Sequence, residues 1–241
     1  MRSLSIIIPA YNEEQRLPAT LQTVAAFLDQ RAFEFAEVIA VNDGSRDGTA
    51  RVIREAAARD PRVRLLENPG NRGKGYAVRH GMREARGEWV LFTDADLSAP
   101  IEELDRLWQA VSAARADGAI GSRALDRSLI GVHQSAFRET SGKFFNLVMR
   151  LITGLPYRDT QCGFKLFSRA AAQAVAARQR IEGFGFDVEI LYIARKLGFR
   201  ILETPVRWNN VEGTKVSLWN GIQAFLDPLE VRRNDWRGLY R

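Results

Sequence analysis

Short apolar runs that alternate with segments of helical period constrain the fold of this chain more than any other feature of its sequence. The runs at residues 6–8, 38–41 and 89–92 have the length of buried strands. Between the runs, apolar residues recur at helical spacing, which indicates amphipathic helices. Buried strands separated by helices form βαβ units with right-handed crossovers, and these units build a mostly parallel sheet. The sequence therefore predicts an α/β fold.

The same pattern predicts where the individual elements lie. Strands are expected at residues 5–9, 38–41, 63–66, 89–93, 119–121, 163–167 and 200–206. Helices are expected at residues 14–29, 49–59, 75–85, 101–114, 141–152, 187–197 and 219–231, the last of them interrupted at Pro228. In the first of these helices, the apolar side chains that share one face are Leu17, Leu21, Val24 and Leu28.

Composition favours a single domain over residues 1–241. The 241 residues are 46% hydrophobic, which is enough for one sizeable core, and no linker-like stretch or repeat interrupts them. The single cysteine, Cys162, excludes an intrachain disulfide and fits a reducing compartment. Because no histidine lies beside Cys162 in the sequence, a buried structural thiol is a better interpretation than a nucleophile.

The charge balance indicates an anionic partner. The formal net charge is +6 and the sequence pI is about 9.8, which suits a nucleotide, a lipid phosphate, a membrane surface or a nucleic acid. Much of the excess lies at residues 232–241, which form either a solvated tail or a functional surface. No motif interleaves aromatic and basic residues, which makes a nucleic-acid interface the weaker candidate. No apolar run reaches the ~18 residues of a spanning helix, so any membrane contact is expected to be peripheral.

Three polar clusters follow expected strands at the points where those strands end. They occupy residues 9–14, 42–45 and 93–96. In an open parallel sheet, ligands bind beyond the carboxyl ends of the strands, so the three clusters are expected to share one rim. Each cluster alone could be a helix cap or a turn. Three clusters on one rim favour a binding site.

Asp94 and Asp96 are the candidates for a metal site. In extended backbone, both side chains would project to the same side, with Ala95 opposite. Two carboxylates at such a short separation repel each other unless a cation or a proton lies between them. Carboxylate oxygens are hard ligands that suit Mg²⁺ or Mn²⁺, and these ions keep positions open for phosphate oxygens. The sequence therefore predicts a Mg²⁺ or Mn²⁺ site at this pair.

A second candidate for anion binding is the segment at residues 71–75. Gly73, Lys74 and Gly75 precede an expected helix. Backbone amides at a helix N-terminus can cradle phosphate, and Lys74 adds a positive charge. The spacing matches neither the Walker motif nor the dinucleotide glycine pattern, so a plain turn is the competing interpretation.

Together these motifs resemble family 2 glycosyltransferases of the GT-A fold, which is Rossmann-like with a mostly parallel central sheet flanked by helices. In the first half of the chain, the resemblance rests on residues 6–14, 42–45 and 94–96. In the second half, the motifs that look like those of polyprenyl-phosphate sugar transferases lie at residues 121–123, 159–167, 186–189 and 212–215. The stretch Asp-Thr-Gln-Cys-Gly-Phe-Lys, which begins at Asp159, is most similar to dolichyl-phosphate β-glucosyltransferases.

The resemblance implies a nucleotide-sugar-binding half at residues 1–123 and an acceptor-binding half at residues 124–241. The residues implied to bind the nucleotide sugar are Pro9, Ala10, Tyr11, Glu13, Asp43, Gly73, Lys74, Asp94 and Ala95. Those implied to act in catalysis are Asp94, Asp96, Gln161, Asp187 and Glu189, with the metal on Asp94 and Asp96. Those implied to bind the acceptor phosphate are Arg123, Arg138 and Lys215.

The resemblance also implies an inverting hexosyl transfer, with glucose from UDP-glucose favoured, onto a polyprenyl or dolichyl phosphate. A phosphate monoester is already anionic near neutral pH, so it can attack the anomeric carbon without a strong base. This agrees with the two histidines, His80 and His133, which sit in no catalytic pattern. GDP-mannose, UDP-N-acetylglucosamine and other lipid or glycan acceptors stay open. A binding or scaffold protein built on an inactive glycosyltransferase also stays open.

Peripheral association with the cytoplasmic face of a membrane is the expected location. The helix at residues 141–152 has a wide apolar face that could receive a prenyl chain or a bilayer surface, with core packing as the alternative. Trp236 and Tyr240 in the basic tail could lie at anionic headgroups. Eukaryotic relatives of the glucosyl type carry an N-terminal membrane helix, and this sequence shows no such segment.

Overall fold

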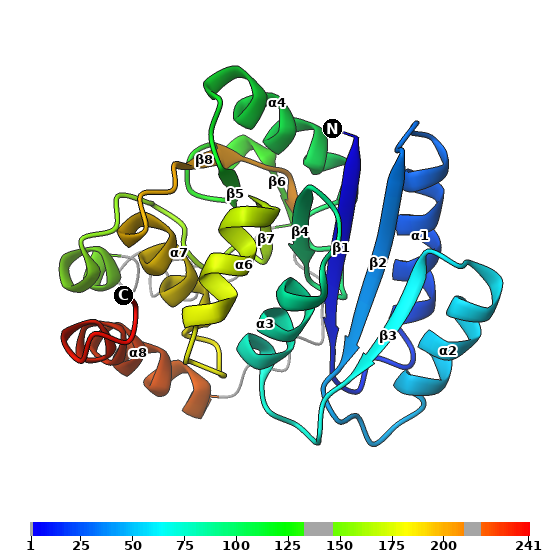
Figure 1. Cartoon of the computed structure of the whole chain (residues 1–241), viewed down its shortest axis with the longest axis horizontal. Helices are drawn as coiled ribbons and strands as arrows, with labels where there is room; N and C mark the ends of the chain where they lie inside the picture. The colour runs from blue at the N-terminus through cyan, green and yellow to red at the C-terminus, as the bar shows by residue number, and fades with distance from the viewer. Residues whose placement is uncertain (1, 133–146, 210–217) are drawn as a thin grey trace.

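The computed structural model describes residues 2–132, 147–209 and 218–241, and its centre is a seven-stranded sheet (Figure 1). The strand order is β3-β2-β1-β4-β7-β5-β8. The strands are β1 (Ser3–Ala10), β2 (Phe35–Asn42), β3 (Val63–Glu67), β4 (Trp89–Thr93), β5 (Gly118–Ser122), β7 (Phe164–Ser168) and β8 (Ile201–Pro205). All run in one direction except β7, which is antiparallel to β4 and to β5. The expected α/β fold with a mostly parallel sheet is confirmed.

Helices cover both faces of this sheet. They are α1 (Leu17–Asp29), α2 (Thr49–Arg59), α3 (Lys74–Glu84), α4 (Leu104–Ala114), α6 (Arg169–Arg178) and α7 (Phe186–Lys196). Helix α8 (Leu218–Trp236) packs against α7, and further helical residues lie at 147–153. One core packs α1, α2 and α4 against the sheet, and the other packs α3, α6 and α7 against the opposite face. Strand β1 serves both cores because its side chains alternate, with Ile6 and Ile8 on one face and Ile7 on the other.

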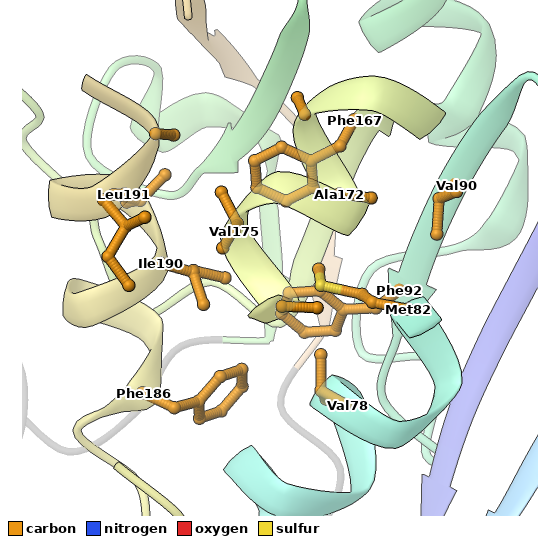
Figure 2. Packing of buried hydrophobic residues seen from close by; sticks show 14 of the residues in the cluster. Val78, Met82, Val90, Phe92, Phe167, Ala172, Val175, Phe186, Ile190 and Leu191 are labelled. Carbon is orange, nitrogen blue, oxygen red and sulfur yellow. The ribbon is translucent and has the colours of Figure 1, made fainter. Parts of the chain in front are cut away.

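The second core brings the two halves of the chain together. Figure 2 shows Phe186 from α7, Val78 and Met82 from α3 and Phe92 from β4 converging in it. The rings of Phe92 and Phe186 lie 5.7 Å apart between centroids. The first residue of α7 is therefore held close to the end of β4, where a polar cluster was expected, and it also lies against Gly75 in the first turn of α3.

Several elements differ from the sequence prediction. Helix α1 begins at Leu17 rather than at residue 14, because Pro18 suits the first helical turn, where no N–H partner is needed. Helix α6 was not expected because its alanine-rich sequence has little periodicity, but Ser168 caps it by accepting a hydrogen bond from the Ala171 amide at 3.2 Å. The short parallel pair of β6 (Ile130–Val132) and β9 (Trp208–Asn209) was also missed.

Helix α8 runs through Pro228 instead of being interrupted there, and both of its faces mix polar and apolar side chains. Asp227 and Asn234 are buried, whereas Leu226, Leu229 and Trp236 are exposed. Throughout the described residues, no helix combines the length and the apolar character needed to cross a bilayer.

The buried carboxyl of Asp227 should make stability depend on pH. Burial raises its pKa to about 6, and Glu230 adds to the effect. Because this pKa lies above that of the unfolded chain, the folded state loses stability as pH rises through about 6. We expect Asp227→Asn to raise the free energy of unfolding by about 1–2 kcal/mol at pH 7.5 and by much less at pH 4. Urea unfolding at the two pH values measures this, and an equal change at both would contradict it.

Candidate active site

The polar clusters after β1, β2 and β4 lie on one rim, as expected, and hydrogen bonds connect them. The Asn12 amide donates to Ser45 Oγ at 2.9 Å, and the Arg46 amide donates to Asn12 Oδ1 at 2.8 Å. Thr20 Oγ1 of α1 donates to the carbonyl of Ala95 at 2.5 Å. The backbone of each cluster is therefore held by its neighbours, which gives the rim a defined shape.

Asp43 fixes the glycine-containing segment that leads into α3. Its Oδ1 accepts from Asn68 Nδ2 at 2.7 Å and from the Arg72 amide at 3.1 Å, and its Oδ2 accepts from the Gly73 amide at 2.7 Å. Gly73 has φ of 105°, a conformation that glycine adopts without strain. Asp43 thus aims the segment that carries Lys74. Contact of Asp43 with the nucleotide sugar stays a prediction, as it does for Pro9 and Ala10 at the end of β1 and for the half-buried Tyr11 and Glu13 in the loop beyond.

Asp94 and Asp96 lie in a tight turn, so the expected extended backbone is wrong. Strand β4 ends at Thr93, and the Leu97 amide donates to the Asp94 carbonyl at 3.1 Å. Leu97 has φ of 46°, which marks the bend. Asp96 Oδ1 accepts from the Ser98 amide at 2.9 Å, so this carboxylate also caps the turn. Turn geometry rather than strand alternation sets the directions of the two carboxylates.

Lys74 pairs with Asp94. Its Nζ lies 2.5 Å from Asp94 Oδ1, and the Asp94 side chain is 33% exposed. Burial lowers the pKa of Lys74, but the carboxylates of Asp94 and Asp187 raise that pKa by more. Lys74 was expected to face phosphate, and the structure places its charge at the candidate metal-binding turn.

Asp187 forms an ion pair with Lys165, a residue for which the sequence predicts no role. Asp187 lies in the first turn of α7, and Lys165 of β7 is completely buried. Lys165 Nζ also donates to the Cys162 carbonyl at 2.6 Å. Burial raises the pKa of Asp187, against the lowering effect of Lys165 and Lys74. Lys165, Asp187, Lys74 and Asp94, which we call the charge cluster, alternate in sign. The available signal was a lysine in the otherwise apolar run of β7.

Gly163 leaves room for the Asp94 carboxylate, because a Cβ at this position would overlap its oxygens. We expect Gly163→Ala to displace that flexible carboxylate while the fold survives. A displacement of about 1 Å at a reacting centre costs on the order of 10²-fold in rate, so turnover should fall by that amount. Rate and melting temperature should be measured together. Gly183→Ala is the control, since a Cβ there would contact nothing within 4 Å. A Gly163→Ala variant with unchanged turnover would contradict the assignment.

Arg123 is oriented by Asp159. Asp159 accepts from Arg123 Nε at 2.7 Å, from an Nη at 2.8 Å and from the Arg123 amide at 3.0 Å. Burial raises the pKa of Asp159, but the Arg123 guanidinium lowers it by more. The Arg123 side chain stays 27% exposed and lies over the ring of Trp208 at 5.3 Å. Arg138 and Lys215, the other residues expected at the acceptor phosphate, lie outside the described residues.

Glu189 and Gln161 occupy different surroundings from each other. Glu189 is completely buried, and its carboxylate accepts from the amides of Arg180 and Ile181 and from the hydroxyl of Tyr240. This geometry indicates a structural role, and direct catalysis by Glu189 stays an untested prediction. Gln161 is half-exposed, and its backbone amide donates to Asp159 Oδ1 at 3.2 Å.

The residues present fit a divalent cation that shares its coordination with a bound phosphate. Within the described part of the chain, no group of three or more His, Cys, Asp or Glu could hold a metal ion. Asp94 and Asp96 offer hard oxygen donors at a partly exposed turn beside the Lys74 ammonium. A cation held by two carboxylates needs further oxygens, which a diphosphate can provide.

Comparison with known proteins identifies relatives along nearly the whole chain. Residues 5–175 match the model of glycosyl transferase family 2. The dolichyl-phosphate beta-glucosyltransferase of Drosophila melanogaster is 42% identical over 93% of this chain and 72% of its own length. The human dolichyl-phosphate beta-glucosyltransferase is 35% identical over 100% of this chain and 78% of its own length.

Solved structures share the fold at low identity. Mannosyl-3-phosphoglycerate synthase from Rubrobacter xylanophilus has a TM-score of 0.69 at 15% identity, covering 98% of this chain and 75% of its own. Glucosyl-3-phosphoglycerate synthase from Mycobacterium tuberculosis, in complex with Mn²⁺, UDP and glucosyl-3-phosphoglycerate, has a TM-score of 0.65 at 17% identity, covering 95% and 80%. The family model and the sequence relatives show that this chain belongs to glycosyl transferase family 2.

Proposed function

We propose that this chain, acting as a single domain over residues 1–241, transfers glucose from UDP-glucose onto a polyprenyl or dolichyl phosphate. The product would be a β-linked lipid-phosphate sugar. The observation that carries the proposal is the charge cluster, which joins the turn after β4 to the first turn of α7 and lies within electrostatic reach of Arg123. The names of the sequence relatives support the donor and acceptor classes.

The charged residues of the site would have different roles in binding and catalysis. Asp159 fixes the orientation of the Arg123 guanidinium. The exposed edge of this guanidinium would then orient the acceptor phosphate. Lys74 would stabilise negative charge on the diphosphate as the sugar leaves. Asp187, buried and balanced between two lysines, would lie beside the sugar. Asp94 and Asp96 would hold Mg²⁺ or Mn²⁺, which supplies further positive charge to the leaving diphosphate when bound.

Donor and acceptor screening tests this function. Purified protein should be incubated with UDP- and GDP-sugars, a polyprenyl phosphate and Mg²⁺ or Mn²⁺, and the lipid product analysed by NMR. We expect UDP-glucose to give a β-linked product. Transfer only from GDP-mannose would correct the donor, and an exclusively α-linked product would refute the inverting mechanism.

The membrane surface expected as a partner would contact one side of α8. Its outer face comprises Leu226, Leu229, Arg233 and Trp236, and Arg237 follows directly after the helix; all five are exposed, with Trp236 exposed to 82%. Apolar side chains among arginines suit an anionic bilayer surface. Leu147 and Leu151, at the end of the expected helix at residues 141–152, are also exposed.

Tyr240 does not belong to this surface, and its expected position at headgroups is wrong. It is completely buried, and its hydroxyl bonds to Glu189. The chain reverses at Gly238, whose φ of 73° ends α8 and turns the last residues inward.

We expect Arg233→Gln/Arg237→Gln to weaken binding to anionic liposomes. Each basic residue near such a surface contributes about 1 kcal/mol, so the partition coefficient should fall about thirtyfold at low salt. Liposome flotation measures this effect. Arg54→Gln/Arg59→Gln on α2 removes the same charge elsewhere and should change the partition coefficient less. Equal losses in the two double variants would show that net charge, not this face, determines binding.

A further inference from the structure

The last aromatic side chain of the chain is buried against α7. Tyr240 is completely buried, and its hydroxyl donates to Glu189 Oε1 at 2.6 Å. Its ring centroid lies 6.1 Å from that of Tyr192. The amides of Gly238 and Leu239 donate to the carbonyls of Asp235 and Asn234, which fixes the reversal that delivers Tyr240. The end of the chain is thus bonded to a buried carboxylate of α7.

Glu189 also bonds to the connection between α6 and α7, and so links Tyr240 to that connection. Its Oε1 accepts from the Arg180 amide at 2.9 Å, and its Oε2 accepts from the Ile181 amide at 2.8 Å. A buried carboxylate depends on such donors, because it has no water to replace them. Tyr240 and two backbone amides together therefore hold Glu189, and Glu189 in turn holds residues 179–182, which we call the clamp loop.

The clamp loop grips the first turn of α3. Gln179 Nε2 donates to the Gly75 carbonyl at 2.8 Å, and the Tyr76 amide donates to the Glu182 carbonyl at 3.2 Å. A Cβ at Gly75 would lie 2.6 Å from the Ile181 carbonyl oxygen. This glycine is therefore required by the clamp loop, whatever its relation to phosphate.

Side chains strengthen the same junction. The carboxylate of Glu182 forms ion pairs with Arg72 at 2.9 Å and with Arg79 at 3.2 Å. Both guanidinium groups also lie over the ring of Tyr76, at 4.7 and 4.8 Å from its centroid. The turn that begins with Lys74 is thus held from the side of the clamp loop, while Asp43 holds the segment before it.

We infer that Tyr240 and Glu189 are positioning residues for donor binding, because they hold the clamp loop and through it keep Lys74 against Asp94. The inference rests on the proposed function, in which Lys74 faces the nucleotide diphosphate. No link in this path requires Tyr240 or Glu189 to touch a substrate. Their effect should therefore fall on donor affinity more than on the chemical step.

Tyr240→Phe tests the inference by removing one hydroxyl from the path. We expect the Kd for UDP with Mn²⁺, measured by calorimetry, to rise roughly three- to tenfold, which is the scale of one lost hydrogen bond to a charged group after partial relaxation. The KM for UDP-glucose should rise in parallel, with kcat changed less than twofold. Glu189→Gln should act in the same direction, since its amide NH₂ cannot accept from a backbone amide.

Tyr157→Phe is the matched control. Tyr157 is also buried, and its hydroxyl donates to the Ile201 carbonyl of β8 at 3.3 Å, away from the clamp loop. Hydrogen exchange of the amides of Tyr76, Arg180 and Ile181 supplies a readout without nucleotide, and it should accelerate in Tyr240→Phe but not in Tyr157→Phe. Equal Kd values for Tyr240→Phe and the unaltered protein would overturn this inference and leave the proposed function untouched. An unaltered protein that binds no UDP would refute the proposed function and this inference with it.

Discussion

Asp96→Ala is expected to lower turnover about a thousandfold. A metal ion that stabilises a leaving diphosphate contributes several kcal/mol to the transition state, and removal of one of two protein ligands forfeits most of it. The fold should survive, because the Asp96 side chain lies at the rim, where it accepts from the Ser98 amide. The loss of that cap costs about 1 kcal/mol.

The measurement is the initial rate of sugar transfer over a titration of Mg²⁺ and Mn²⁺. Asp105→Ala is the control, since Asp105 is a half-exposed aspartate on α4 that pairs with Arg31. If Asp96→Ala keeps more than a tenth of the wild-type rate at saturating metal, Asp96 is not a metal ligand.

Lys165→Met is expected to destabilise the protein by about 3–5 kcal/mol. Removing one partner of a buried ion pair leaves the other charge uncompensated, and Asp187 has little access to water. Because a protonated Asp187 costs less to bury, the loss should grow as pH rises above the carboxyl range. Urea unfolding at pH 5 and pH 8 measures both the size and the sign.

The double variant Lys165→Met/Asp187→Leu separates stability from activity. Replacing both charges with apolar groups of similar size should restore most of the lost stability, as for other buried pairs. Turnover should stay low, because Asp187 is absent from the cluster. Recovery of activity together with stability would show that the pair serves only the core.

The parallel core and the shared rim could be predicted from sequence, because both depend on local patterns. Apolar runs such as residues 38–41 mark buried strands, and the polar residues after them mark strand ends. The antiparallel β7 could not be predicted, since its apolar run is compatible with either direction and long-range pairing decides. The turn at Asp94 was missed for a similar reason. Its bend depends on a left-handed residue, Leu97, of a type that rarely adopts that conformation.

The sequence indicated which residues belong to the candidate site better than it indicated which of them contact each other. The sequence predicted one shared site for Asp94, Lys74 and Asp187, and the structure brings their charges together, while their roles stay predictions. Partnerships between distant segments, such as Arg123 with Asp159, carry no local signal in one sequence. Tyr240 is the clearest example, because a tyrosine in a basic tail gives no indication that it turns inward to a buried carboxylate.

The antiparallel strand β7 also has a consequence for how the chain is made. Strands β1 to β4 can pair with one another as soon as the first 93 residues have left the ribosome. Strand β5, complete at Ser122, has no place beside β4 until β7 is synthesised more than forty residues later. During that interval β4 presents an open edge to solvent. A nascent chain with this topology would therefore hold a four-stranded sheet with an open edge until β7 is made, and it would be prone to aggregation during that interval.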